Sequence, residues 1–327
     1  MMLMRFVGLA PLLLSLVAGA CGESADPEPP VDGPDDVCTV PTLTDAPAPA
    51  SALTAFAYDR AAAYDPVLSP IGTAPGVQIH ALSFLSPRGT DRATGILFVP
   101  EGAGPFAGIL LMHGLPGNAE QMTAYGTLLA RHGAVVVALD APFARRGGAV
   151  LRFTEADSVE QVQLMTDLQR AVDLLVARPD VDASRLGYVG ISYGGAMGAL
   201  FVGLERRLRT SVLVVADGGL VTHFTGPEDG DSPLASLSCA AQRRWLESMM
   251  PIEPIKYIGF ASPTPLLLQS GRQDELVPPR DAERLHAAAP DPKTVQWYEA
   301  GHSLDGTAVR ARSFWLHEHL GMLAPDF

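Results

Sequence analysis

Residues 190–195 read Gly190-Ile191-Ser192-Tyr193-Gly194-Gly195, and this stretch carries the strongest structural signal in the chain. It follows an apolar run with strand character and precedes a run with helical character. A serine with glycine two positions away on either side, set between a strand and a helix, is typical of a sharp turn that exposes a nucleophilic hydroxyl. The alternative is a tight turn in which Ser192 only caps the helix.

Apolar strand-like runs alternate with amphipathic helical runs on both sides of this turn. Strands are predicted at 77–85, 95–100, 106–112, 134–139, 186–191, 211–216, 265–269 and 294–298. Helices are predicted at 119–131, 158–177, 193–204 and 279–288, with a last helix that ends at Leu320. This order predicts an α/β fold, a mostly parallel sheet with helices on both faces, as a single domain over 51–327 with a short cap insertion at about 220–262.

A serine hydroxyl is a weak nucleophile, so it needs a base and a third group that orients the base. Asp274 directly follows the strand at 265–269, and His302 follows the next strand. The carboxyl ends of parallel strands meet at one edge of a sheet, so both loops should reach Ser192. The order Ser, Asp, His along the chain is that of a known type of catalytic triad. Asp217 also ends a strand and remains an alternative acid, as does Glu275.

The loop after the strand at 106–112 reads His113-Gly114-Leu115-Pro116-Gly117. Hydrolysis through a serine needs two backbone N–H groups that bind the oxyanion, one from the residue after the nucleophile and one from this loop. Position therefore selects Tyr193 and Leu115, because Pro116 has no N–H. The alternative is a glycine-rich connection without a chemical role.

Together with Gly301-His302 and the segment 271–278, these motifs resemble the dienelactone-hydrolase-related and prolyl-oligopeptidase-type members of the α/β-hydrolase superfamily. The resemblance covers about residues 74–320. It implies one catalytic domain that acts through an acyl-enzyme without a cofactor. Ser192 stands where dienelactone hydrolases have cysteine, and too few residues precede the first strand for the propeller of prolyl oligopeptidases.

Several residues are candidates for a substrate pocket. Phe224, Trp245, Met249 and Met250 lie in the insertion, where they either line a cleft or form its own small core. Phe143, Arg145 and Arg146 follow the strand at 134–139. An arginine there could bind a substrate carboxylate, although a solvated loop charge is the simpler interpretation.

Charge and composition exclude several classes of partner. The chain has 327 residues, a net charge of -13 and only two lysines, Lys256 and Lys293, so nucleic acid is not an expected partner. His317 and His319 lie two apart on a helix, and the chain has neither an HExxH motif nor paired Cys-His spacing, so we expect no metal site.

The amino terminus predicts export. Arg5, the apolar run 6–17 and the small residues 18–20 form a signal peptide over 1–20. The stretch 17–21 resembles a bacterial lipobox, with Ala18 where leucine is usual, which predicts lipidation of Cys21 and anchoring to the bacterial cell envelope. Simple cleavage with an unmodified Cys21 is the alternative. Residues 22–50 are rich in Pro, Asp, Glu and Ala and predict a disordered tether.

The remaining cysteines, Cys38 and Cys239, could form a disulfide, as expected in an oxidising compartment; two free thiols are the alternative.

From the triad motifs and the amino terminus together, we expect an exported serine hydrolase that cleaves small-molecule carboxylic esters or lactones. The alternatives are a serine peptidase that uses the same triad and a non-catalytic surface lipoprotein.

Overall fold

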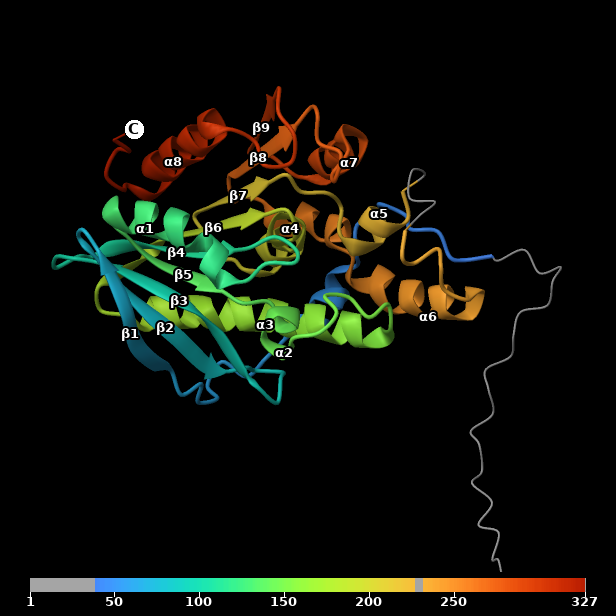
Figure 1. Ribbon diagram of the computed structural model, residues 1–327, viewed down its shortest axis with the longest axis horizontal. Coiled ribbons are helices and arrows are strands. Elements are labelled where there is room, and N and C mark those ends of the chain that lie inside the picture. The colour runs from blue at the N-terminus through green and yellow to red at the C-terminus, as the bar shows by residue number, and fades with distance from the viewer. Residues whose placement is uncertain (1–38, 227–231, 327) are drawn as a thin grey trace, which may run out of the picture. The chain divides into compact units, whose positions relative to one another are not determined.

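The structure is a computed structural model, and it describes residues 39–226 and 232–326. A single nine-stranded sheet organises this part of the chain (Figure 1). Its strands follow the order β1-β2-β3-β5-β4-β6-β7-β8-β9. The bounds are β1 Val67–Ala74, β2 Val77–Leu85, β3 Arg92–Pro100, β4 Phe106–Met112, β5 Ala134–Leu139, β6 Val181–Ile191, β7 Thr210–Val214, β8 Leu266–Gly271 and β9 Lys293–Tyr298.

The sheet is antiparallel at one end and parallel over the rest. β1, β2, β3 and β5 pair antiparallel, whereas β5, β4, β6, β7, β8 and β9 are mutually parallel. β5, β7 and β8 are buried at every position, and β4 is buried at every position after Phe106, because helices cover both faces of these strands. All parallel strands therefore end at the same edge, and the loops at that edge meet.

Helices cover the two faces of the sheet. α3 (Glu155–Ala177), α4 (Tyr193–Leu204) and α7 (Pro279–Ala288) pack on one face. α1 (Thr123–Arg131) and α8 (Gly306–Leu320) pack on the other. The predicted α/β fold, with a mostly parallel sheet between two helical layers, is confirmed, and the structure adds β1 as an antiparallel edge strand.

The segment between β7 and β8 leaves the alternating pattern. It contains α5 (Leu220–Phe224), α6 (Cys239–Met249) and three short 3-10 helices, η3 (Met250–Ile252), η4 (Pro254–Lys256) and η5 (Ile258–Ala261). Trp245 on α6 is fully buried, and its indole N–H donates to Asp157 on α3 at 2.9 Å. The insertion is thus anchored in the core.

The remaining short elements are η1 (Ala50–Phe56), η2 (Ala119–Met122) and α2 (Pro142–Arg146). η1 begins at Ala50, the last residue of the segment predicted as a tether, and Phe56 at its end is buried. Within 39–226 and 232–326, no helix has the length and apolar character needed to cross a bilayer.

Candidate active site

Ser192 lies in the turn between β6 and α4. Its backbone has φ 55° and ψ -118°, a conformation that costs energy in any residue with a side chain. The close approach of strand and helix requires the two neighbouring glycines: a Cβ on Gly190 would lie 2.0 Å from the carbonyl oxygen of Gly194, and one on Gly194 would lie 2.4 Å from that of Met112. The turn therefore holds the serine hydroxyl at the carboxyl edge of the sheet.

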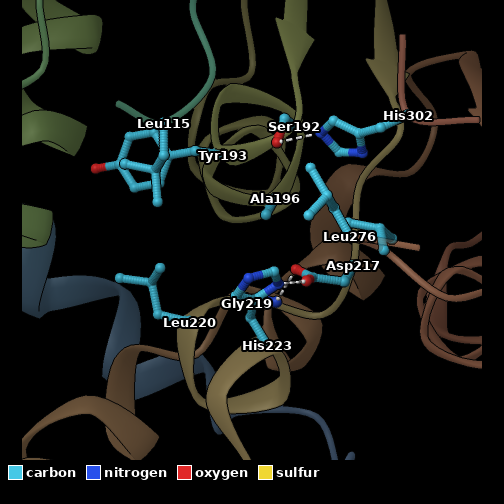
Figure 2. Close-up of a pocket in the computed structure, with 11 residues that line it drawn as sticks. Leu115, Ser192, Tyr193, Ala196, Asp217, Gly219, Leu220, His223, Leu276 and His302 are labelled. Atoms are coloured by element: carbon cyan, nitrogen blue, oxygen red, sulfur yellow. Dashed lines mark hydrogen bonds and ion pairs between the residues drawn. The ribbon is translucent and has the colours of Figure 1, made fainter. Parts of the chain in front are cut away.

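The hydroxyl of Ser192 meets the imidazole of His302, and His302 meets the carboxylate of Asp274. Nε2 of His302 lies 2.9 Å from Oγ of Ser192 (Figure 2). Nδ1 of the same ring lies 3.0 and 2.9 Å from the two carboxylate oxygens of Asp274. Both predicted contacts of His302 are thus present.

The surroundings of Asp274 fix the tautomer of the histidine. The Asp274 side chain is 1% exposed, and its Oδ1 accepts the backbone N–H groups of Leu276 and Val277, each at 2.9 Å. An ionised carboxylate only accepts hydrogen bonds, so Nδ1 of His302 is the donor and Nε2 can accept the proton of Ser192. This arrangement activates a nucleophile.

The two residues predicted to form the oxyanion hole border the same cavity as the hydroxyl of Ser192. Tyr193 is the first residue of α4, and Leu115 lies in the loop after β4; both line the cavity at Ser192. Among the described residues, neither N–H donates to a backbone carbonyl. Both residues thus border the cavity at the nucleophile, and their role as the oxyanion hole stays a prediction.

His113 stabilises the Leu115 loop. Its ring is buried, with Nδ1 donating to the carbonyl of Gly114 at 2.8 Å and Nε2 accepting the N–H of Ala141 at 3.1 Å. Burial lowers the pKa of His113, in agreement with a neutral ring that donates once and accepts once. His113 thus links the loop after β4 to the loop after β5.

Asp217, the alternative acid, pairs with a different histidine. Its Oδ2 lies 2.9 Å from Nδ1 of His223, and its Oδ1 accepts the N–H of Gly219 at 3.0 Å. Among the carboxylates in the described part of the chain, only Asp274 hydrogen-bonds to His302. The sequence reasoning did not identify His223, although its position six residues after a strand-ending aspartate in the insertion was a usable signal.

A cavity of about 240 Å³ opens at the triad (Figure 2). Ser192, His302 and the two N–H residues lie along one side of it, and Asp217 and His223 lie opposite. The complete lining is Leu115, Ser192, Tyr193, Ala196, Asp217, Gly219, Leu220, His223, Leu276, Val277 and His302.

None of the residues proposed from the sequence as pocket residues lines this cavity. Arg145 is 5% exposed because Asp167 and Asp91 bind its guanidinium, at 2.8 and 3.0 Å. Arg146 pairs with Glu160 at 2.5 Å. Neither arginine lines the cavity, so the structure does not support the possibility that one of them binds a substrate carboxylate. The simpler interpretation, a solvated loop charge, also fails for Arg145, which is buried and paired.

The aromatic candidates are mainly core residues. Phe143 packs edge-on between the rings of His113 and Tyr193, and Trp245 and Met249 are buried in the main core that the insertion shares with α3 and α4. Phe224 lies in a second, apolar hollow of about 280 Å³, which shares Leu115 with the cavity at the triad. Of the seven candidates, only Phe224 thus borders this hollow beside the site.

Cys239 is disulfide-bonded. Cys38 and Cys21 lie outside the described residues, so the pairing of Cys38 with Cys239 and the lipidation of Cys21 stay predictions. Within the described ranges, no group of three His, Cys, Asp or Glu side chains could hold a metal ion.

Comparison with known proteins adds family information. Residues 125–303 match the prolyl oligopeptidase family. The uncharacterized protein YfhR of Escherichia coli (strain K12) is 27% identical over 223 residues, which are 65% of this chain and 70% of YfhR. The mitochondrial acyl-coenzyme A thioesterase 2 of Mus musculus is 28% identical over 167 residues, 49% of this chain and only 34% of the thioesterase.

Among solved structures, acetyl xylan esterase 1 from Thermoanaerobacterium sp. JW/SL YS485 superposes with a TM-score of 0.66. The superposition covers 84% of this chain and 96% of the esterase, at 19% identity. At 19% identity this likeness concerns the fold alone.

Proposed function

Because the chain belongs to the prolyl oligopeptidase family of α/β-hydrolases, we propose that it is a serine hydrolase that cleaves carboxylic esters or lactones through an acyl-enzyme on Ser192. The observation that carries this proposal is the contact of His302 with both Ser192 and Asp274, at 2.9 Å in each case. The fold alone would not establish it, since one fold hosts many functions.

The geometry supports a two-step reaction. Oγ of Ser192 attacks the ester carbonyl while Nε2 of His302 takes the hydroxyl proton, and Asp274 stabilises the resulting imidazolium. The N–H groups of Leu115 and Tyr193 bind the oxyanion. His302 then gives the proton to the leaving alcohol oxygen, and the C–O bond breaks.

Water completes the reaction. His302 removes a proton from a water molecule, whose oxygen attacks the acyl carbon bound to Ser192, and the same proton returns to Oγ as the acid leaves. In a lactone, the leaving alcohol stays attached to the acyl group. No cofactor takes part in any of these steps.

Ester cleavage is supported by the relatives. The mouse relative is named a thioesterase and the structural neighbour an acetyl xylan esterase, and both names describe acyl transfer from an ester. The family name favours peptide bonds as a second candidate substrate, because the same triad could attack an amide. The two candidates differ only in the leaving group.

A fluorophosphonate probe and two chromogenic substrates test the proposal. We expect the probe to label wild-type protein but not Ser192→Ala, while Ser303→Ala, an exposed serine beside His302, is labelled normally. We also expect turnover of p-nitrophenyl butyrate to exceed that of an aminoacyl-proline p-nitroanilide. The reverse preference would establish the peptidase, and no labelling of wild-type protein would favour a non-catalytic surface lipoprotein.

We further propose that the protein is exported and anchored to the cell envelope by a lipid on Cys21. The signal-peptide pattern at 1–20 supports this, as does the disulfide at Cys239, since disulfides persist in oxidising compartments. The wild-type protein should partition into the detergent phase of a Triton X-114 extract, and Cys21→Ser should move it to the aqueous phase. Aqueous partitioning of both would contradict the anchor.

A further inference from the structure

The cavity at the triad is largely aliphatic, but one wall is polar. Asp217 and His223 form that wall, opposite Ser192 (Figure 2). The Asp217 side chain is 5% exposed, the His223 side chain is 34% exposed, and 2.9 Å separates Oδ2 of Asp217 from Nδ1 of His223. The reaction proposed above gives neither residue a role.

The structure holds this pair in place from two sides. The N–H of Gly219 donates to Asp217, and α5, which carries His223, begins at the next residue. The fully buried Glu253 accepts the N–H groups of Val221 and Thr222 in the first turn of α5, at 3.1 and 2.8 Å. A polar pair fixed by buried hydrogen bonds is oriented before a substrate arrives.

We propose that Asp217 and His223 form a hydroxyl-binding subsite that selects esters whose acyl chain carries a hydroxyl group. This inference rests on the proposed function and names a substrate class for it. A carboxylate offers about four acceptor positions, and Asp217 uses two of them in the hydrogen bonds from Gly219 and His223. A substrate hydroxyl can donate to a further position.

Charge favours a hydroxyl over a carboxylate. A substrate carboxylate would face Asp217 in a poorly solvated wall, and like charges repel strongly there. A hydroxyl brings no charge and supplies the donor that a carboxylate lacks.

The position of the pair assigns the hydroxyl to the acyl chain. A carbonyl oxygen between the N–H groups of Leu115 and Tyr193 leaves the alcohol near Nε2 of His302, which must protonate it. The acyl chain then extends past Ala196 and Leu220 toward His223, across the cavity in Figure 2. A volume of about 240 Å³ suits a short chain of a few carbons.

Three p-nitrophenyl esters test the proposal: the butyrate, the 3-hydroxybutyrate and the monoester of glutaric acid. For the wild-type protein we expect kcat/KM on the 3-hydroxybutyrate to exceed that on the butyrate by about tenfold, the effect of one good hydrogen bond. The glutarate ester, which carries a carboxylate, should be the poorest substrate.

Variants of His223 test whether this residue causes the preference for the 3-hydroxybutyrate over the butyrate. His223→Phe keeps a planar ring but removes the nitrogens, and it should reduce the ratio of the two kcat/KM values to about one, whereas His223→Gln should restore part of it. His80→Phe makes the same change on β2 outside the cavity lining, and it should leave the ratio as in wild type.

The outcomes separate this inference from the proposed function. Hydrolysis of the butyrate with no preference for the 3-hydroxybutyrate, or a preference that His223→Phe retains, overturns the subsite and leaves the serine hydrolase standing. A preference for the glutarate ester overturns the hydroxyl assignment. If Ser192 reacts with no ester and no fluorophosphonate, the proposed function fails first.

Discussion

Two Asp–His pairs face the same cavity, and their local geometry is nearly the same. In both, a carboxylate oxygen lies 2.9 Å from Nδ1 of the imidazole, and in both the aspartate side chain is at most 5% exposed. The difference lies beyond the ring. Nε2 of His302 lies 2.9 Å from the hydroxyl of Ser192, whereas His223 stands across the cavity from it.

This difference shows what an Asp–His pair needs in order to act as a base. The pairing itself only orients a ring. A reaction requires a nucleophile on a constrained turn and N–H groups that bind the developing charge, and the structure brings these together at Ser192 alone among the described residues. We therefore propose a catalytic role for the first pair and a role in substrate recognition for the second.

Replacing each histidine by alanine should give the largest difference in kcat between the two pairs. His302→Ala deprives Ser192 of its base, and we expect kcat on p-nitrophenyl butyrate to fall by about 10⁴-fold or more. His223→Ala should lower kcat by no more than about tenfold, because no proton in the proposed reaction passes through it. Assays of p-nitrophenyl butyrate hydrolysis measure kcat for both variants, and fluorophosphonate labelling measures the reactivity of Ser192.

Equal losses of kcat in the two variants would break the distinction between the pairs. Circular dichroism and thermal melting of both proteins are the controls, since an unfolded variant loses activity whatever its chemical role.

Replacing each aspartate by asparagine should give a smaller difference in kcat between the two pairs, again with the larger loss at the first pair. Asp274→Asn keeps the shape of the side chain but favours the wrong tautomer of His302, and kcat should fall by about 10³- to 10⁴-fold. Asp217→Asn should change the preference between the 3-hydroxybutyrate and the butyrate more than it changes kcat. A larger loss of kcat in Asp217→Asn than in Asp274→Asn would make Asp217 the acid.

Topology explains why the sequence identified the first pair. β8 and β9 are parallel neighbours with Gly271 opposite Tyr298, so the loops that carry Asp274 and His302 must lie side by side. A sequence pattern that predicts two consecutive parallel strands therefore also predicts this contact. Buried strands such as β4 and β5 have uniform apolar runs, and the predicted bounds of both were confirmed.

The second pair and the pocket wall depend on tertiary packing that no local pattern encodes. β1 escaped prediction because it is exposed at nearly every position and contains Pro70 and Gly72. The sequence left open whether Arg145 binds a substrate, because its ion-pair partners Asp91 and Asp167 come from other parts of the chain. Glu253 could not be placed beside α5 from sequence, since 3-10 turns rather than a periodic helix carry it there.

The groups that hold the two Asp–His pairs in place differ in their response to pH. Backbone N–H groups of Leu276 and Val277 hold Asp274, whereas the second pair depends on Glu253, whose pKa burial raises to about 8 from a usual value of 4.5. Between these two values the unfolded chain releases a proton that the folded chain retains. The stabilisation by the protonated form is therefore complete below about pH 4.5 and is lost as pH rises through 8.

Glu253→Gln removes this titration and should expose it. We expect the difference in free energy of unfolding between wild type and Glu253→Gln, measured by urea denaturation, to shift against wild type by a few kcal/mol between pH 5.5 and 8.5. Glu247→Gln, an exposed position on α6, is the matched control and should run parallel to wild type. A parallel course for Glu253→Gln as well would show that Glu253 is ionised throughout, held by the N–H groups of Val221 and Thr222, and that both pairs rest on supports insensitive to pH.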